Sequence, residues 1–144
     1  GLSQSIAQVS EAVIEADGVT RVALDHLIQE LATMAETGRL QVGVHYKIRE
    51  IEGDLAIRLG ASLSEYRRYH RETQLDTELL NRKAYRQQIK ENHDREGYVT
   101  HTSMSVNLSG RVGEREQKRC VVICFDRAKD FGLDLDGFSL EVGL

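Results

Sequence analysis

The apolar residues of this chain repeat with two different periods, and the change falls at Gly38. Before Gly38 they recur every three or four positions, as on one face of an amphipathic helix. After it they alternate with polar residues or glycine, as on a half-buried strand, through Leu40, Val42, Val44, Tyr46 and Ile48. A chain that carries both patterns has to pack helices on a sheet. We therefore expect an α+β fold with a mainly antiparallel sheet of about four strands.

Residues 1–38 are predicted to form a helical hairpin. The first helix ends at Gly18, and its apolar stripe is Leu2, Ile6, Val9 and Val13. The second is expected from about Thr20 to Glu36, with the stripe Leu24, Ile28, Leu31 and Ala35. Gly38 then stands at the C′ position, where glycine commonly ends a helix.

Residues 98–125 predict a β-hairpin, followed by an acidic tail over residues 126–144. The segment "KRCVVICF" is apolar on both faces, as in a central strand. On one strand Cys120 and Cys124 would lie about 13 Å apart, too far for a disulfide, so we expect both to be small core residues. The tail is expected to add a short strand at residues 138–142, and its acidic residues are Asp126, Asp130, Asp134, Asp136 and Glu141.

The stretch "YKIREIEGDLAIRLGASLSEYRRYHRE", residues 46–72, has two interpretations. In the first, residues 40–60 form a β-hairpin around a two-residue loop, Glu52-Gly53. That register pairs Ile48 with Ile57 and Tyr46 with Leu59, and it gathers the apolar side chains on one face. This interpretation accounts for more of the residues with fewer exceptions.

The second interpretation is a helix-turn-helix over residues 52–71. Ala56 would pack in the first helix, Gly60 would make the turn, and Tyr66 would fill an apolar position of the second helix. The residues "DLAIRLGASLSEYRRYHRE" resemble the helix-turn-helix motifs of bacterial transcription factors, sigma factors in particular. The resemblance implies a recognition helix whose basic residues face DNA. Against it, Gly53 would weaken the first helix.

The segment 62–96 is expected to be a basic helix. A capping box, Ser62 to Glu65, predicts its start. Its apolar stripe is uneven, so the segment is either one long, weakly apolar helix or two helical pieces. Between Tyr66 and Lys90, seven basic side chains stand against three acidic ones. The candidate contact residues for a nucleic acid or an acidic partner are Arg67, Arg68, His70, Arg71, Arg82, Lys83 and Arg86.

The composition excludes several classes of protein. With 144 residues and 40% apolar content, the chain suits a single domain over residues 1–144. No apolar run approaches the roughly 20 residues of a membrane helix, and the start lacks the features of a secretory signal, so we expect a cytoplasmic protein without a membrane partner. No metal-binding spacing, phosphate loop or nucleophile motif is present. We therefore predict no catalytic residues, no cofactor, no metal and no small-molecule substrate.

The function predicted from these features is non-enzymatic. The leading hypothesis is a protein-interaction or self-assembling structural module, because a weakly apolar helix is stabilised by packing against another copy or a partner. The competing hypothesis is a small DNA-binding transcriptional regulator that uses the helix-turn-helix. The net charge of −4 counts against the second, since the field of an acidic protein opposes approach to phosphate.

Overall fold

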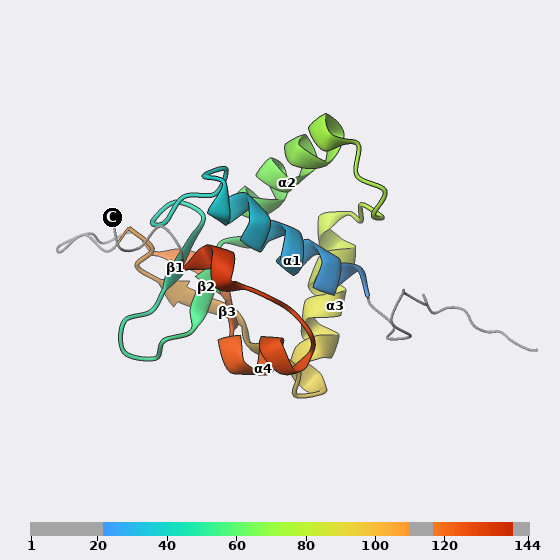
Figure 1. Cartoon of the computed structure of the whole chain (residues 1–144). Coiled ribbons are helices and arrows are strands. Elements are labelled where there is room, and N and C mark those ends of the chain that lie inside the picture. Colours follow the sequence, from blue (N-terminus) through green and yellow to red (C-terminus); the bar gives the residue numbers. More distant parts are fainter. Residues whose placement is uncertain (1–21, 110–116, 140–144) are drawn as a thin grey trace, which may run out of the picture.

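The computed structural model describes residues 22–109 and 117–139, which form four α-helices, a 3₁₀ turn and a four-stranded antiparallel sheet (Figure 1). The helices are α1 (Ala23–Glu36), α2 (Leu59–Thr73), α3 (Arg82–Asp94) and α4 (Phe125–Asp130), and the 3₁₀ turn is η2 (Asp136–Phe138). The strands are β1 (Tyr46–Ile48), β2 (Leu55–Ile57), β3 (Val99–Val106) and β4 (Lys118–Ile123). The α+β class and the antiparallel sheet predicted from the sequence are confirmed.

The sheet has the strand order β1-β2-β4-β3, so β2 and β4 lie in its interior. The pairing of β2 with β4 runs from Leu55 beside Ile123 to Ile57 beside Val121. Residues 118–120 of β4 therefore extend past the end of β2 and pair with β3 alone. Because α2 begins at Leu59, its first turn lies next to this extension of β4.

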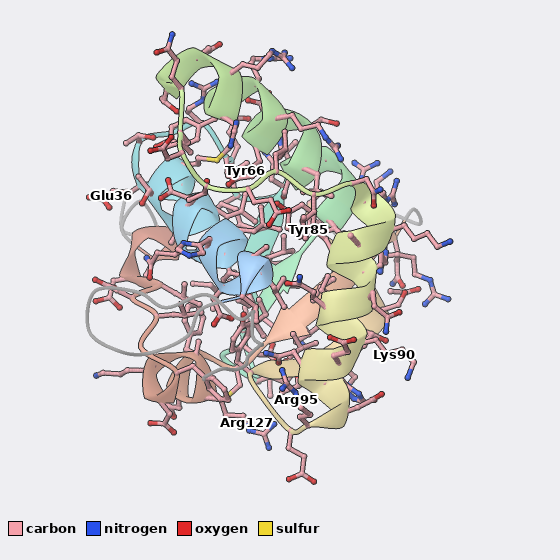
Figure 2. All side chains as sticks on the ribbon, turned by 90° about the vertical axis from the view of Figure 1, so that its right-hand side faces the viewer. Glu36, Tyr66, Tyr85, Lys90, Arg95 and Arg127 are labelled. Carbon is pink, nitrogen blue, oxygen red and sulfur yellow. The ribbon has the colours of Figure 1, made fainter. Side chains whose placement is uncertain are left out.

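The main core lies between one face of the sheet and the helices. α1 lies across that face (Figure 1) and buries its apolar stripe there, including Leu24, Leu27 and Leu31. Tyr66 of α2 and Tyr85 of α3 are fully buried in the same core (Figure 2). Two of the three tyrosines in the basic segment 62–96 are thus part of the interior.

The segment 46–57 forms a hairpin of β1 and β2, as the first interpretation predicted, but in a different register. Ile48 pairs with Leu55 and Tyr46 with Ile57, which is two residues away from the predicted pairing. The loop has four residues because Arg49 and Asp54 close it through a backbone hydrogen bond of 2.8 Å and an ion pair of 2.7 Å. A shift of two residues preserves the faces, so Tyr46, Ile48, Leu55 and Ile57 still contribute to one core, as predicted.

No helix-turn-helix forms over residues 52–71. Strand β2 occupies the place of the first helix of that motif. The three residues of β2 are buried, and the strand lies between β1 and β4. Burial of the whole segment Leu55–Ile57 in the sheet outweighs the helical spacing of Ala56, Gly60 and Tyr66.

The strand predicted from Leu40 is shorter than its alternation indicates. Gly43 has φ +86°, and its amide donates to the carbonyl of Tyr46 (2.8 Å), so residues 43–45 form a turn. Val42 and Val44 are consequently exposed, and only residues 46–48 pair as a strand.

The basic segment forms two helices, α2 and α3, rather than one helix over residues 62–96. Gln74 ends α2 with φ +53°, and the Asn81 side chain caps α3 by accepting from the Ala84 amide (2.8 Å). α2 starts at Leu59 instead of Ser62, because Leu59 is buried in the core and extends the helix. Ser62 therefore lies inside α2, where its buried hydroxyl has no partner among the described residues, and the predicted capping box is wrong.

The two ends of the chain match the predictions in part. The first predicted helix falls in residues 1–21, outside the described residues; the second is α1, and Gly38 follows it with φ +88° as predicted. Phe138 belongs to η2 rather than to a strand, and residues 140–144 lie outside the described part. None of the helices in the described ranges is long and apolar enough to cross a membrane.

The two cysteines are free thiols that occupy different environments. Cys120 is buried in β4 as predicted, within a small cluster that includes Ala56 and Val122 on the second face of the sheet. Cys124 is half-buried and takes the N-cap position of α4, so it ends the strand instead of belonging to it.

Candidate anion-binding cleft

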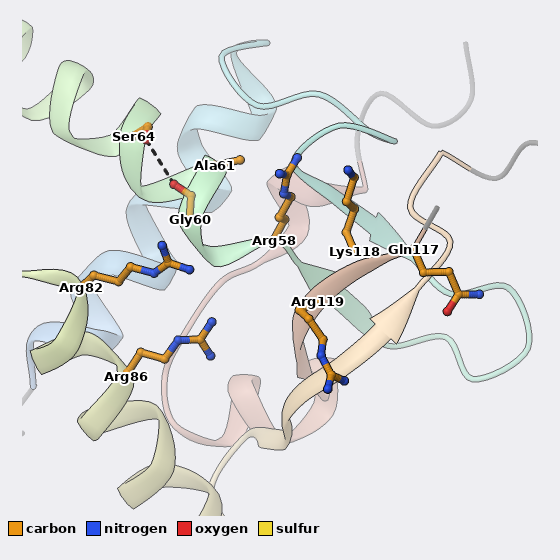
Figure 3. A pocket seen from close by; sticks show the side chains of 9 residues that line it. All are labelled: Arg58, Gly60, Ala61, Ser64, Arg82, Arg86, Gln117, Lys118 and Arg119. Atoms are coloured by element: carbon orange, nitrogen blue, oxygen red, sulfur yellow. Dashed lines mark hydrogen bonds between the residues drawn. The ribbon is translucent and has the colours of Figure 1, made fainter. Parts of the chain in front are cut away.

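A cleft opens where the end of β2, the start of α2, the first half of α3 and the start of β4 meet (Figure 3). Its volume is about 500 Å³. We call it the basic cleft, and the nine described residues that line it are Arg58, Gly60, Ala61, Ser64, Arg82, Arg86, Gln117, Lys118 and Arg119.

Positive charge dominates the basic cleft. Five of the nine lining residues are Arg or Lys, and none is Asp or Glu. Arg82 and Arg86 extend from α3 toward the side chains that come from the β2–α2 junction and from β4 (Figure 3). Among the described residues, no carboxylate forms an ion pair with any of the four cleft arginines. The positive charge of these four arginines is therefore not compensated by a carboxylate in the described ranges.

Neutral groups of β3 hold two of these arginines. Arg86 donates through Nη1 to the carbonyl of Thr102 (3.3 Å), and Arg119 donates through Nη1 to the hydroxyl of Ser105 (3.4 Å). A guanidinium has five N–H donors, so each contact fixes the side chain and leaves further donors for a ligand.

The start of α2 adds positive potential to the cleft. Arg58 takes its N-cap position, where Ser, Thr, Asp or Asn is preferred, and no side chain caps the first turn. That turn also lacks an acidic residue, although the N-terminal end of a helix dipole favours negative charge. The start of α2 therefore departs from the usual N-cap residue and from the usual negative charge of a first turn, beside the cleft arginines. Such departures from local sequence preferences are common at ligand-binding sites.

Gly60 allows Arg82 to approach this end of α2. A Cβ at Gly60 would stand 3.3 Å from Nη1 of Arg82 and 3.4 Å from its Cζ, closer than an ordinary contact. The two residues of the first turn that line the cleft, Gly60 and Ala61, are both small, and Arg82 lies close to the backbone there.

The charge of Arg58 reaches the residues behind the cleft. Burial lowers the pKa of His45, and Arg58 adds to that lowering against the opposing effect of Glu65. Burial also raises the pKa of Cys120 to about 11, and here Arg58 opposes the shift because it favours a thiolate. Both effects have the sign expected of a nearby cation.

The described lining residues of the basic cleft include few of the side chains that covalent and metal chemistry use. No His or Cys is among them, and the hydroxyl of Ser64 donates to the carbonyl of Gly60 (3.2 Å). Within residues 22–109 and 117–139, no three His, Cys, Asp or Glu side chains are grouped so that they could hold a metal ion. What the arrangement can do is attract anions and bind them through several guanidinium groups at once.

The structure divides the predicted contact residues into two groups. Arg82 and Arg86 line the basic cleft, whereas Lys83 does not. The other four lie on α2, outside the cleft lining: Arg67, Arg68, His70 and Arg71. In that group His70 bonds through Nε2 to the carbonyl of Thr77 (2.7 Å), and Arg68 pairs with Glu65 (3.2 Å).

Three cleft residues are missing from the predicted set: Arg58, Lys118 and Arg119. They come from two strands that are far apart in the sequence, so a count of charges along the chain does not find them. The antiparallel pairing of β2 with β4 brings Arg58, which follows β2, beside residues 118–120. A prediction of that strand pairing would have supplied the missing signal.

Comparisons of the chain with protein-family models, with curated proteins and with solved structures found no match.

Proposed function

We propose that this protein is a non-enzymatic binding module that holds the phosphodiester backbone of a nucleic acid in its basic cleft. The observation that carries the proposal is the set of five cationic side chains, from three parts of the chain, that line one cleft with no acidic residue among the described residues of its lining. Phosphate contacts of this kind supply most of the affinity of nucleic-acid-binding proteins that do not read sequence.

Phosphate suits the cleft better than an isolated carboxylate does. Four of the five cations are arginines, whose planar guanidinium groups bind phosphate oxygens in pairs. A nucleic-acid backbone also repeats its charge along a line, so several cleft residues can be engaged by one molecule. The open first turn of α2 offers backbone amides to one of these phosphates.

The net charge of the chain limits the affinity of this binding. The charge of −4 means that the rest of the protein repels a polyanion, so attraction has to come from the local field of the cleft. We therefore expect dissociation constants in the range of non-specific binding, about 1–100 μM at physiological salt, and much tighter binding at low salt.

Fluorescence anisotropy with a labelled 20-base-pair duplex in low salt tests the proposal. The informative pair of variants is Arg82→Gln and Lys83→Gln, because these residues are neighbours on α3, both are exposed, and only Arg82 lines the cleft. Loss of one phosphate contact should weaken duplex binding about tenfold for Arg82→Gln. Lys83→Gln should change it by less than about twofold, since its charge lies outside the cleft and is screened.

The α2 surface supplies a second control. Arg68 and Arg71 are exposed on α2 and do not line the cleft. A double change of both to Gln should leave duplex binding within about threefold of the unchanged protein, because long-range attraction is screened. Equal losses in the α2 variant and in Arg82→Gln would show diffuse attraction to the whole basic segment and would contradict a site in the cleft.

A second candidate function, self-association, is supported by an apolar surface at the opposite edge of the sheet. β1 is an edge strand, and the large apolar side chains near it include Val42 and Val44, which are 45% and 47% exposed, and Ile51, which is 93% exposed. A hollow of about 570 Å³ beside them is lined in part by Ile48, Leu108 and Phe138. Edge strands with exposed apolar residues are common sites of pairing between chains.

Light scattering at low and high salt tests this second candidate. Association through apolar residues should persist at high salt and should be reduced by Ile51→Lys, which places a charge at the tip of the hairpin. A strictly monomeric protein at high micromolar concentration in both conditions would exclude it.

A further inference from the structure

We infer that the basic cleft prefers duplex to single-stranded nucleic acid and binds it without regard to base sequence. This inference rests on the function proposed above and adds the class of nucleic acid. It follows from where the chain places its aromatic residues, which proteins use to stack unpaired bases.

All eight aromatic residues lie in the described ranges, and none lines the basic cleft. Four of the five tyrosines and one phenylalanine are fully buried: Tyr46, Tyr66, Tyr85, Tyr98 and Phe138. Phe125 is half-buried in α4 and packs against the main core.

The two remaining aromatic rings are already in contact with other side chains. Tyr69 is half-buried, and the guanidinium of Arg39 lies over its ring at 5.3 Å from the centroid. Phe131, 49% exposed, follows α4 and packs edge-on against Tyr98, with 5.6 Å between centroids. Residues 110–116, which precede Gln117 in the sequence, contain no aromatic residue. A single strand entering the cleft therefore meets no stacking surface made of aromatic rings.

The cleft also has few groups that can read base edges. Gln117 is its one carboxamide, and the Ser64 hydroxyl is already bonded to Gly60. Its arginines can donate to guanine, but with no second polar group to select a base, their contacts go mainly to phosphate. Binding through phosphate alone depends on charge density, and a duplex carries more charge per unit length than a single strand.

The size of the preference follows from counterion release. Five phosphate contacts give a slope of log K against log salt of about −4.5 on a duplex and about −3.5 on a single strand. If both forms bind equally at 1 M salt, the duplex is favoured about 20-fold at 50 mM salt and about 5-fold at 200 mM salt.

Competition measurements on the full chain test the inference. The probes are a labelled 20-base-pair duplex, each of its two separated strands, a second duplex of unrelated sequence, and poly-glutamate as an acidic polymer without phosphate. The expected result is duplex binding that exceeds binding of either strand at least fivefold at 50 mM salt, with the two duplexes within twofold of each other. Phe131→Ala should change none of these values, because Phe131 is outside the cleft.

Other outcomes overturn the inference in distinguishable ways. Single strands that bind as tightly as the duplex would overturn the duplex preference and leave nucleic-acid binding intact. A difference above tenfold between the two duplexes would overturn sequence independence. Binding of poly-glutamate alone, or of no probe, would overturn the proposed function and this inference with it.

Discussion

The guanidinium of Arg82 lies against the bare backbone of Gly60, 3.3 Å from the point where a Cβ would stand. This contact joins α3 to the first turn of α2 and places a cation at the positive end of a helix dipole. Such an arrangement is electrostatically unfavourable in the free protein and becomes favourable when an anion binds beside both groups.

Gly60→Ala should raise the free energy of unfolding and lower the affinity for a duplex. Alanine has a higher helix propensity, and the displaced atoms belong to the exposed end of a flexible arginine, so the free energy of unfolding should rise by about 0.4–1 kcal/mol. Duplex affinity should fall several-fold, because the new methyl group moves Arg82 and covers the first turn of α2. Thermal unfolding and anisotropy on the same samples measure both; an equally stable or stabilised variant with unchanged affinity would show that Gly60 has no part in binding.

Substitution of two other glycines by alanine should cause very different losses of stability. A Cβ at Gly137 would clash with the carbonyl oxygen of Ala32, so Gly137→Ala has to push η2 away from α1 and should cost about 3 kcal/mol or more. Gly38 has φ +88° but no atom within 4 Å of its Cβ position, so Gly38→Ala should cost only about 1 kcal/mol of backbone strain. Denaturant unfolding of both variants checks the order, and a reversed order would mean that η2 is not packed on α1 as described.

Alkaline pH should destabilise the protein through Cys120. Burial raises the pKa of this thiol to about 11, while in the unfolded chain it ionises near pH 9. Between pH 9 and pH 11 the thiol is ionised in the unfolded chain and still protonated in the folded protein. The free energy of unfolding therefore has its full value below pH 9 and falls as the pH rises toward 11. We expect a loss of about 1 kcal/mol between pH 8 and pH 10 from this group.

Cys120→Ala isolates that contribution, because burial also raises the pKa values of Tyr66 and Tyr85 and their effects remain in the variant. The variant is expected to be less stable at pH 8, since it loses a buried sulfur. Its further decrease up to pH 10 should be smaller than that of the unchanged protein. Parallel pH profiles in the two proteins would contradict a buried, protonated Cys120.

Much of the fold could be predicted from periodicity, and the failures have local causes. Alternation identified β3, a run that is apolar on both faces identified β4, and the stripe of α1 was correct because one face of that helix is buried. The register of the β1–β2 hairpin was missed because the Arg49–Asp54 pair sets the loop length. The start of α2 was missed because burial of Leu59 outweighed a favourable capping sequence at Ser62, and local patterns do not report such tertiary effects.

Less of the candidate site could be predicted. The local excess of basic residues identified Arg82 and Arg86, but it also included Lys83 and the four residues on α2, which lie outside the cleft lining. Arg58 and Arg119 join the site only through the pairing of β2 with β4, a long-range contact. The density of basic residues along the sequence therefore identified the cleft residues on α3. Identifying Arg58 and Arg119 would have required the register of the sheet.

The salt dependence of duplex binding tests the central claim most directly. For the unchanged protein, log K against log salt between 50 and 200 mM should have a slope of about −4.5, which is a loss of about 500-fold. Arg82→Gln should reduce the slope to about −3.6, and Lys83→Gln should leave it unchanged. A slope near zero, or an equal reduction by both variants, would contradict phosphate binding in the basic cleft.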